Sequence, residues 1–337
     1  MRKLFAVSLA FLGCSTASTG STTHSDFAPG PSGASSMGQG SSDGATLQVG
    51  TLTAGIWDDS LNFELFTAYR DAQKAPLADF TAEEQLAAAQ ASRSVATALD
   101  ITLVIDTTGS MGDEISWLKT DFTAIASDVT AAHPGVPVRW GLVHYRDDGD
   151  EYVVRQADFT ASVAAYQAGL AALGAGGGGD FPEVPERALA QAAQLSWDAT
   201  SATGKLIFWI ADAPPHDGQA SAFSAAVRSL RDSGVHIYPV ASSGIDERTE
   251  YAMRASAQLT LGRYLFLTDD SGVGDTHKTP SVPCYVVTKL SQAVERVVAS
   301  ELAGRPVAVE PQQVVRAVGG PVDGACTLQD GHMAHLF

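Results

Sequence analysis

The stretch DITLVIDTTGSMGD, residues 100–113, decides the fold of this chain. Residues 101–105 are apolar or β-branched with no polar alternation, which predicts a strand buried on both faces, as parallel sheets require. Asp106, Thr108 and Ser110 follow at alternate positions, so a tight turn can bring their oxygens together. One carboxylate and two hydroxyls form a ligand set for a hard divalent cation, Mg²⁺ or Ca²⁺. Open α/β sheets bind ligands in loops at the carboxyl ends of parallel strands.

Strands and helices are predicted to alternate along the rest of the chain. Strands over residues 136–147 and 152–160 are expected to pair as a hairpin across the acidic turn 147–151. Further strands are predicted at 206–212, 235–240 and 263–270, and helices at 111–131, 163–173, 186–197, 223–230, 246–261 and 287–304. This alternation predicts an α/β, doubly wound domain over residues 99–304.

Two segments precede this domain. Residues 15–46 are dominated by Ser, Thr and Gly with almost no large apolar residue, so we expect an unfolded tether. Residues 47–98 are expected to form a strand and two helices, the second starting at a capping box on Thr81, and to dock on the domain as a preface. Asp58 and Asp59 in this preface are either a second cation site or, as adjacent carboxylates in a turn more often are, a solvated loop or a helix cap.

Length and composition set the class of protein. A chain of 337 residues with 45% hydrophobic and 18% charged residues is typical of a globular protein with one or two domains. Its 21 basic and 38 acidic residues give a net charge of −17. Nucleic acids and anionic membrane surfaces both need clustered Lys and Arg, so this charge argues against them as partners. An acidic chain is compatible with binding cations.

Residues 1–14 have the pattern of an export signal. Arg2 and Lys3 precede an apolar stretch too short to span a bilayer, and the stretch ends at Cys14. The sequence FLGC resembles a bacterial lipoprotein box, which implies cleavage before Cys14 and lipidation of that cysteine in the cell envelope. The alternative is a secretory signal cut near residues 17–18. In the first case a lipid anchor is the only expected contact with a membrane, since no other segment is long and apolar enough to cross one.

The last segment, residues 305–337, is expected to be a short extension. Asp330-Gly331 between apolar runs predicts a hairpin with a two-residue turn. Besides the cysteine of the leader, the chain has Cys284 and Cys326, an even number for an oxidising compartment. We expect these two to form a disulfide. The alternative is two separate buried thiols, because the sequence does not give the distance between them.

Acidic residues recur where predicted central strands end or in the loop between them. They are Asp106 in D-x-T-x-S, Asp180 after the glycine-rich run 174–179, and Asp212 after the apolar strand LIFWIA. A D-x-[ST]-x-[ST] motif after one buried strand, with an Asp ending a second, is similar to the metal-ion-dependent adhesion site of the von Willebrand factor type A domain. DTTGSM, HYRDDGDE, GGGGDFPE and WIADAPPH together resemble the subgroup found in hemicentin-like proteins and in certain α-kinases. The resemblance covers about residues 99–304.

This resemblance implies a six-stranded, mostly parallel sheet between helices, with one antiparallel edge strand. It implies that Asp106, Thr108 and Ser110 form the first ligand loop for Mg²⁺ or Ca²⁺ and that Asp212 supplies the third. In the second loop the family commonly supplies a Thr, whereas this chain has Asp180 there. Three carboxylates would hold the cation more tightly and weaken its attraction for a carboxylate of a partner protein.

Other roles are open for the same residues. Asp106 and Asp212 can merely cap helices, and Ser110 is well placed as an N-cap. Against this, convergent carboxylates at the ends of buried strands need a counter-charge. The glycine-rich run 174–179 does not predict a phosphate-binding loop, because no G-x-x-x-x-G-K-[ST] motif occurs in the chain.

Three more features have two interpretations each. The acidic turn 147–151 has the charge to bind Ca²⁺ but lacks the spacing of an EF-hand loop, so we expect a solvated hairpin turn. His216 and His277 are candidate ligands or bases, although isolated loop histidines usually are neither.

Three functions fit this sequence. The first is an envelope-anchored binding module in which a bound cation takes a carboxylate from a partner protein. The second is a hydrolase in which the metal activates water and His216 or Glu183 is the base. The hydroxyl-rich first loop argues against it, so we expect no enzymatic activity. The third is an envelope scaffold in which the metal only stabilises the fold.

Overall fold

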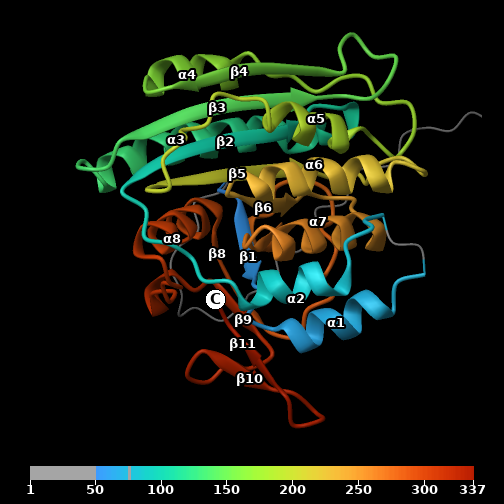
Figure 1. The fold of residues 1–337 in the computed structure, drawn as a ribbon, viewed down its shortest axis with the longest axis vertical. Coiled ribbons are helices and arrows are strands. Elements are labelled where there is room, and N and C mark those ends of the chain that lie inside the picture. The colour runs from blue at the N-terminus through green and yellow to red at the C-terminus, as the bar shows by residue number, and fades with distance from the viewer. Residues whose placement is uncertain (1–50, 75–76) are drawn as a thin grey trace, which may run out of the picture. The chain divides into compact units, whose positions relative to one another are not determined.

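A nine-stranded mixed sheet forms the centre of the structure, in the strand order β4-β3-β2-β5-β6-β7-β1-β8-β9 (Figure 1). The computed structural model describes residues 51–74 and 77–337. In chain order the strands are β1 (Thr53–Trp57), β2 (Ala98–Asp106), β3 (Val138–Tyr145), β4 (Val154–Thr160), β5 (Thr203–Ala211), β6 (Val235–Ala241), β7 (Tyr264–Leu267), β8 (Tyr285–Lys289) and β9 (Arg316–Val318). The run β3-β2-β5-β6-β7 is parallel, and β4, β1, β8 and β9 each pair antiparallel with their neighbours.

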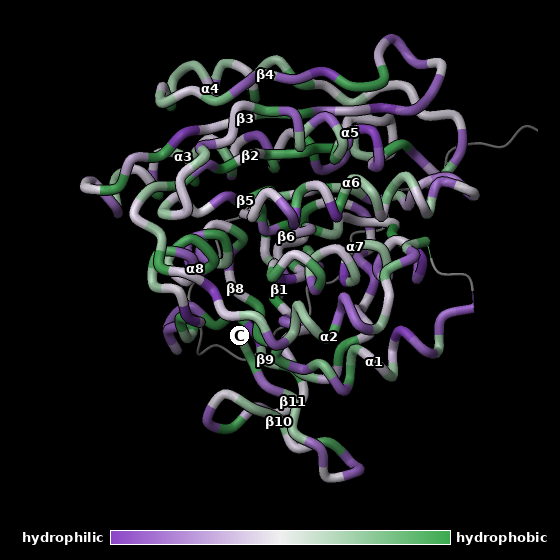
Figure 2. Tube along the Cα trace, viewed as in Figure 1, coloured by the Kyte–Doolittle hydropathy of each residue, from purple (hydrophilic) through white to green (hydrophobic). Residues whose placement is uncertain are grey.

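Helices cover both faces of the sheet and bury two separate hydrophobic cores. The first face carries α3 (Ile115–Ala132), α4 (Val163–Ala171) and α8 (Leu290–Ala303); the second carries α5 (Pro185–Ala192), α6 (Ala220–Asp232) and α7 (Glu247–Leu259), with α1 (Phe63–Asp71) and α2 (Ala82–Gln90) outside them. Alternate residues of β2 enter opposite cores: Leu103 and Ile105 pack toward α3, and Val104 packs toward α5. This two-sided burial explains the unbroken apolar run, seen along β2 and β5 in Figure 2.

The parallel pairing of β2 with β5 places their acidic ends together. Ile105 lies opposite Ile210 in the register, so Asp106 and Asp212 leave the sheet at the same edge. On the other side of β2, Asp106 lies opposite Tyr145 at the end of β3. The loops that follow these strands therefore gather at one edge, which we call the carboxyl edge.

The predicted α/β sheet is confirmed, but its expected number of strands, six, is too small. The hairpin of β3 and β4 forms as predicted, and β4 is the antiparallel strand at that edge. At the opposite side, β1, β8 and β9 extend the sheet beyond β7. Val287, predicted to begin the last helix, lies in β8, and that helix begins at Leu290. The β-branched run in β8 pairs with β1, a partner that local periodicity does not reveal.

The expected preface is part of the sheet rather than a block that docks on it. Strand β1 lies between β7 and β8 and pairs antiparallel with both. Asp58 and Asp59 follow β1 and are buried, so they are not a solvated loop. Arg263 Nε donates to Asp58 Oδ2 at 2.9 Å, and the Arg254 guanidinium donates to both Asp59 oxygens at 2.9 and 2.7 Å. These arginines already supply the counter-charge that a cation would bring.

Local sequence signals in the preface are confirmed. The capping box at Thr81 is present: Glu84 N–H donates to Thr81 Oγ1, and Thr81 N–H donates to Glu84 Oε2. Asp58 Oδ1 also accepts from the backbone N–H of Leu61 at 2.9 Å. This contact closes a turn before α1, whose N-cap is Asn62, so Asp58 is not the predicted helix cap.

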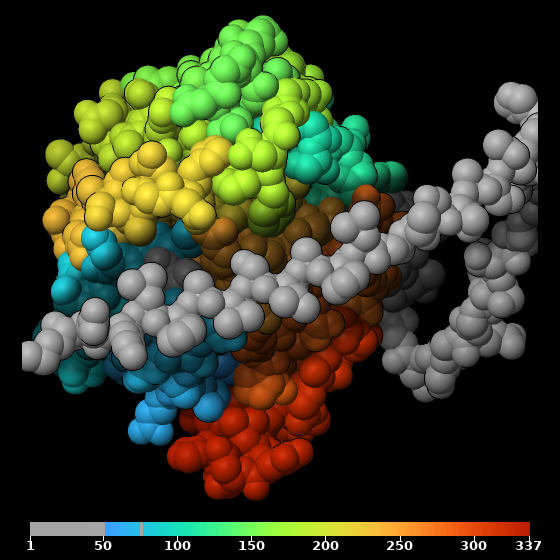
Figure 3. Space-filling model, turned by 90° about the vertical axis from the view of Figure 1, so that its right-hand side faces the viewer, coloured from blue at the N-terminus to red at the C-terminus, as the bar shows by residue number. Residues whose placement is uncertain are grey.

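The C-terminal extension forms the predicted hairpin, with strands β10 (Ala325–Thr327) and β11 (Met333–His335). Its turn is longer than the predicted two residues, because Gly331 N–H donates back to the Leu328 carbonyl and the residue pair Thr327 and Met333 closes the ladder. A disulfide joins Cys326 in β10 to Cys284 just before β8. The red C-terminal segment lies beside the blue N-terminal residues in Figure 3, and His335 N–H donates to Asn62 Oδ1 at 2.7 Å.

Several sequence features fall outside the described residues. They are the leader 1–14 with Cys14, the tether 15–46 and the first residues of the predicted preface. Within the described ranges, none of the helices has the length and apolar character needed to span a bilayer.

The ion pair between Asp59 and Arg254 gives a test of the extended sheet. Both side chains are 1% exposed, so Asp59→Asn leaves a buried guanidinium without its main counter-charge. We expect a loss of about 3–5 kcal/mol in the free energy of unfolding, measured by urea denaturation. The matched control is Asp71→Asn, which removes an exposed partner of Arg70 and is expected to cost less than about 1 kcal/mol. An equally small loss of unfolding free energy in both variants would show that the domain does not depend on the preface for its stability.

Candidate metal centre

Three loops meet at the carboxyl edge and are tied together by backbone hydrogen bonds. The first follows β2, the second is the glycine-rich loop before α5, and the third follows β5. Gly109 N–H donates to the Gly177 carbonyl at 3.1 Å, which joins the first loop to the second. Glu183 N–H donates to the Pro214 carbonyl at 2.9 Å, which joins the second to the third. Gly177 has φ +78°, a conformation that side chains disfavour, so the glycine is needed at this junction.

The first loop holds its oxygens as the sequence predicted. Asp106 Oδ1 accepts from the Thr108 backbone N–H at 2.9 Å and from its hydroxyl at 2.7 Å. The Thr108 and Ser110 hydroxyls lie 3.3 Å apart. Asp106 and Thr108 are buried, whereas Ser110 is exposed, so the group reaches the surface at Ser110. The predicted helix here is split: residues Gly109–Asp113 form a 3₁₀ turn before α3, which bends the loop over Asp106.

Asp212 and Glu183 complete this group from the other two loops. Asp212 is 5% exposed; burial raises the pKa of its carboxyl, and the Ser110 hydroxyl partly offsets this rise. Glu183 is 2% exposed; burial raises the pKa of its carboxyl, and the Thr108 hydroxyl partly offsets this rise. We call these five residues, Asp106, Thr108, Ser110, Glu183 and Asp212, the Asp106 site. Gly178 makes room for it, since a Cβ there would lie 3.1 Å from Glu183 Oε1.

Each carboxylate of the Asp106 site has one buried oxygen without a hydrogen-bond partner among the described residues: Asp106 Oδ2, Glu183 Oε2 and Asp212 Oδ1. Burial, followed by the charge of Asp212, raises the pKa of Asp106 to about 7. Burial also raises the pKa of Asp212 to about 6, and burial with the charge of Asp106 raises that of Glu183 to about 9. Buried carboxylates that repel one another need a counter-charge.

The donor chemistry of this group suits a divalent cation, although its three acids are not among the described residues whose ligand atoms lie within 4.8 Å of one another. Its donors are carboxylate and hydroxyl oxygens, the ligands that Mg²⁺ and Ca²⁺ prefer. Asp106, Thr108, Ser110, Glu183 and Asp212 would hold the ion, and its two positive charges would offset most of the negative charge of the three acids. Ser110 is the exposed member of the site and marks the side from which a ligand of the ion approaches.

The structure places Asp180 in a different group. Its side chain is 62% exposed, and its carboxylate lies 4.0 Å from His216 Nδ1. His216 Nε2 lies 2.8 Å from Asp147 Oδ1. Asp147, Asp180 and His216 each offer a ligand atom, and these atoms lie within 4.8 Å of one another, close enough to share a metal ion. We call these three residues the His216 cluster.

The sequence indicated Glu183 only as a possible base; its burial beside Thr108 adds it to the candidate ligands. One signal in the sequence was its position between two apolar residues, Pro182 and Val184. A carboxylate in such a segment is buried at a cost unless it has a partner. The position of Asp180 and Glu183 in the loop depends on the positive φ of Gly177 and Gly178, which the sequence does not show.

The acidic turn between β3 and β4 is solvated as expected at Asp148 and Glu151, which are exposed, but not along its whole length. Asp147 is buried. Asp150 Oδ2 accepts from the backbone N–H of Gly178 at 2.9 Å and from that of Asp147 at 3.1 Å. The turn therefore supports the glycine-rich loop, because the loop has backbone N–H groups that need acceptors.

His277 links two other acidic residues near the same edge. Its Nε2 lies 2.7 Å from Glu114 Oε1, and its Nδ1 lies 2.8 Å from Asp269 Oδ1. Burial lowers the pKa of His277, but the hydrogen bonds to these carboxylates outweigh it and raise the pKa overall. The imidazole thus fastens the segment after β7 to the start of α3, as a structural contact.

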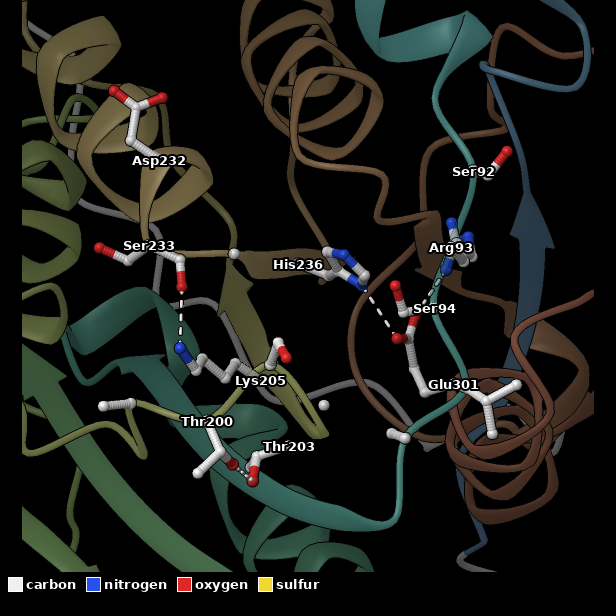
Figure 4. Close-up of a pocket in the computed structure, with 16 residues that line it drawn as sticks. Ser92, Arg93, Ser94, Thr200, Thr203, Lys205, Asp232, Ser233, His236 and Glu301 are labelled. Carbon is white, nitrogen blue, oxygen red and sulfur yellow. Dashed lines mark hydrogen bonds and ion pairs between the residues drawn. The ribbon is translucent and has the colours of Figure 1, made fainter.

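A pocket of about 360 Å³ lies at the opposite end of the sheet, where β5 and β6 begin (Figure 4). Glu301 in this pocket accepts from Arg93 Nη1 at 2.5 Å and pairs with His236 Nδ1 at 2.9 Å; Tyr238 also donates to it. These groups neutralise one another, and the pKa of Glu301 is held at about 2, with His236 and Arg93 opposing the effect of burial. The pocket is therefore separate from the Asp106 site.

Comparison with known proteins agrees with this geometry. The family model of the von Willebrand factor A domain matches residues 100–277, which include the whole Asp106 site. The chain belongs to the von Willebrand factor A domain family. The matched range starts in β2 and ends at His277, so it leaves β1 and β8 outside the family's model.

Two curated relatives match this chain over short segments. An ariadne-like RING finger protein of Acanthamoeba polyphaga mimivirus is 28% identical over 120 residues, which are 35% of this chain and 11% of that protein. Alpha-protein kinase vwkA of Dictyostelium discoideum is 26% identical over 119 residues, which are 35% of this chain and 19% of the kinase. The chain thus corresponds to a small part of each relative.

Solved structures with similar folds include two bacterial proteins. The conserved hypothetical protein BatB from Bacteroides thetaiotaomicron has 11% identity and a TM-score of 0.44, covering 61% of this chain and 99% of BatB. The pilus adhesin SpaC from Lactobacillus rhamnosus GG, in its open conformation, has 15% identity and a TM-score of 0.39, covering 50% of this chain and 27% of SpaC.

Neutralising one acid of the Asp106 site is expected to have opposite effects with and without a cation. In chelated protein, Asp106→Asn removes mutual repulsion and should raise the melting temperature. With Mg²⁺ or Ca²⁺ at about 100 times its Kd, the parent protein gains about 2.7 kcal/mol, and the variant should gain almost none. Differential scanning calorimetry measures both effects. The control Asp128→Asn, on the exposed side of α3, should change neither, and a variant that keeps the cation-induced shift would refute the site.

Proposed function

We propose that this protein is a cation-dependent binding module of the cell envelope. One divalent cation, Mg²⁺ or Ca²⁺, binds at the Asp106 site and takes a carboxylate from an acidic side chain of a partner protein. The observation that carries this proposal is that Asp106, Glu183 and Asp212 each have one buried carboxylate oxygen without a hydrogen-bond partner in the described part of the chain. We propose a binding role rather than an enzymatic one.

Two exposed aromatic side chains support the binding role. Phe181, in the glycine-rich loop, is 44% exposed, and Trp117, in the first turn of α3, is 38% exposed. Both belong to segments that contribute to the Asp106 site or directly follow it. Aromatic residues are enriched in protein interfaces, so we infer that the partner presents an acidic residue with apolar neighbours.

A structural role for the metal is the second candidate, and Glu183 is the observation that favours it. The resemblance implies a Thr in the second loop, where this chain brings a third buried carboxylate. Three acids around one ion leave it less positive toward a further carboxylate. In that case the cation stabilises an envelope scaffold and attracts no acidic ligand.

Panning a displayed peptide library on the purified protein distinguishes the two candidates. In Mg²⁺ or Ca²⁺ we expect enrichment of peptides with Asp or Glu beside apolar residues, and elution of these peptides by EDTA. Asp106→Ala should abolish the enrichment, and Phe181→Ser should weaken peptide binding by about tenfold, or 1.4 kcal/mol. The matched control is Leu86→Ser on α2, since Leu86 is 46% exposed.

Two results would each reject one of the proposed roles of the cation. A cation-induced rise in melting temperature without acidic enrichment would leave the structural role and reject the binding module. Enrichment that survives EDTA would reject the cation as the point of contact.

We further propose that the protein is exported and held in the bacterial envelope by a lipid on Cys14. The disulfide between Cys284 and Cys326 supports this proposal, because disulfides persist in oxidising compartments. The match to the kinase vwkA supports placing the domain in the subgroup shared by α-kinases and hemicentin-like proteins.

The anchor is tested by labelling cells with a radioactive fatty acid. The parent protein should incorporate the label and sediment with membranes, whereas Cys14→Ser should do neither. Equal labelling of both proteins would remove the lipid anchor and leave the ordinary secretory signal.

A further inference from the structure

The His216 cluster brings together side chains from three separate loops of the carboxyl edge. Asp147 follows β3, Asp180 belongs to the glycine-rich loop, and His216 follows β5. Their ligand atoms lie within 4.8 Å of one another. Exposure increases from Asp147, which is buried, through His216 to Asp180, so the cluster is open to solvent on one side. None of the three belongs to the Asp106 site.

Glu186 provides an independent observation at the same place. It lies in the first turn of α5 and is 4% exposed, and its Oε2 has no hydrogen-bond partner among the described residues. Its other oxygen lies 4.0 Å from Arg187 Nε. The segment that leads into α5 lies against the loop that carries His216, since Glu183 and Pro215 form a β-bridge. A buried carboxylate oxygen without a partner is costly, so a cation beside His216 would relieve it.

We propose that Asp147, Asp180 and His216, with Glu186 beside them, form a second metal site that selects Zn²⁺ or a similar transition-metal ion. An imidazole nitrogen with carboxylate oxygens is a ligand set typical of Zn²⁺. The Asp106 site offers only oxygens, which suit Mg²⁺ and Ca²⁺. The two sites therefore differ in ligand chemistry, and each can be loaded separately.

The competing occupant is a proton. A protonated His216 between two carboxylates would also neutralise them, since its bond to Asp147 at 2.8 Å is compatible with an ion pair. A proton, however, leaves Glu186 Oε2 unpaired, whereas a metal ion offers it a bond. Binding of a transition metal by the folded protein through His216 would distinguish the metal ion from the proton.

The test is Zn²⁺ titration of the full mature chain by calorimetry, in excess Mg²⁺ to fill the Asp106 site. We expect one tight Zn²⁺, with affinity lowered more than about tenfold by His216→Ala and by Asp147→Asn. Substituting Co²⁺ for Zn²⁺ gives a second measurement, because visible absorption of bound Co²⁺ reports nitrogen ligation and should be lost in His216→Ala. Asp180→Asn changes an exposed side chain and should weaken binding without affecting folding.

Two controls separate this site from the Asp106 site and from other histidines. His332→Ala removes a histidine that pairs with Asp330 at 3.0 Å on the exposed hairpin, and it should leave Zn²⁺ affinity unchanged. Asp106→Ala should also leave it unchanged, so failure of the proposed function and failure of this site are distinguishable. Absence of Zn²⁺ and Co²⁺ binding, or equal loss in the His332 control, overturns the proposal.

Discussion

Uncompensated negative charge at the carboxyl edge is the constraint on which the site depends. Three other buried acids pair with arginines: Asp59 with Arg254, Asp58 with Arg263, and Glu301 with Arg93. Asp106, Glu183 and Asp212 have no such partner among the described residues. Buried carboxylates in this state are costly, so a ligand that supplied the missing charge would stabilise them.

The local patterns of the sequence predicted the elements that depend on neighbours in the chain. The apolar run of β2, the hairpin of β3 and β4 and the capping box at Thr81 all follow from periodicity or short motifs. The insertion of β1 between β7 and β8 does not, because its strand partners and the arginines that bind Asp58 and Asp59 come from the distant end of the chain. Contacts between such distant segments do not appear in the hydrophobic periodicity of either segment.

In the candidate site, too, some residues could be predicted from the sequence and others could not. Asp106, Thr108 and Ser110 lie within one turn, so their spacing alone indicated convergence, and the parallel pairing of β2 with β5 brought Asp212 to them. Glu183 and Asp180 lie in a loop whose path is set by glycines with positive φ and by Asp150. A shift of three residues along that loop decides which acid faces Thr108 and which faces His216.

The position of β1 also affects how the chain reaches its native state. Strand Thr53–Trp57 is made early, but it cannot pair until Tyr264–Leu267 and Tyr285–Lys289 have followed it through synthesis. Until then β6 is the open edge of the partly formed sheet, and such an edge invites pairing with other chains. Contacts between such distant segments slow folding, so the nascent protein has a long interval of exposure to aggregation. A chaperone that shields this edge would have its effect late, when the sheet closes.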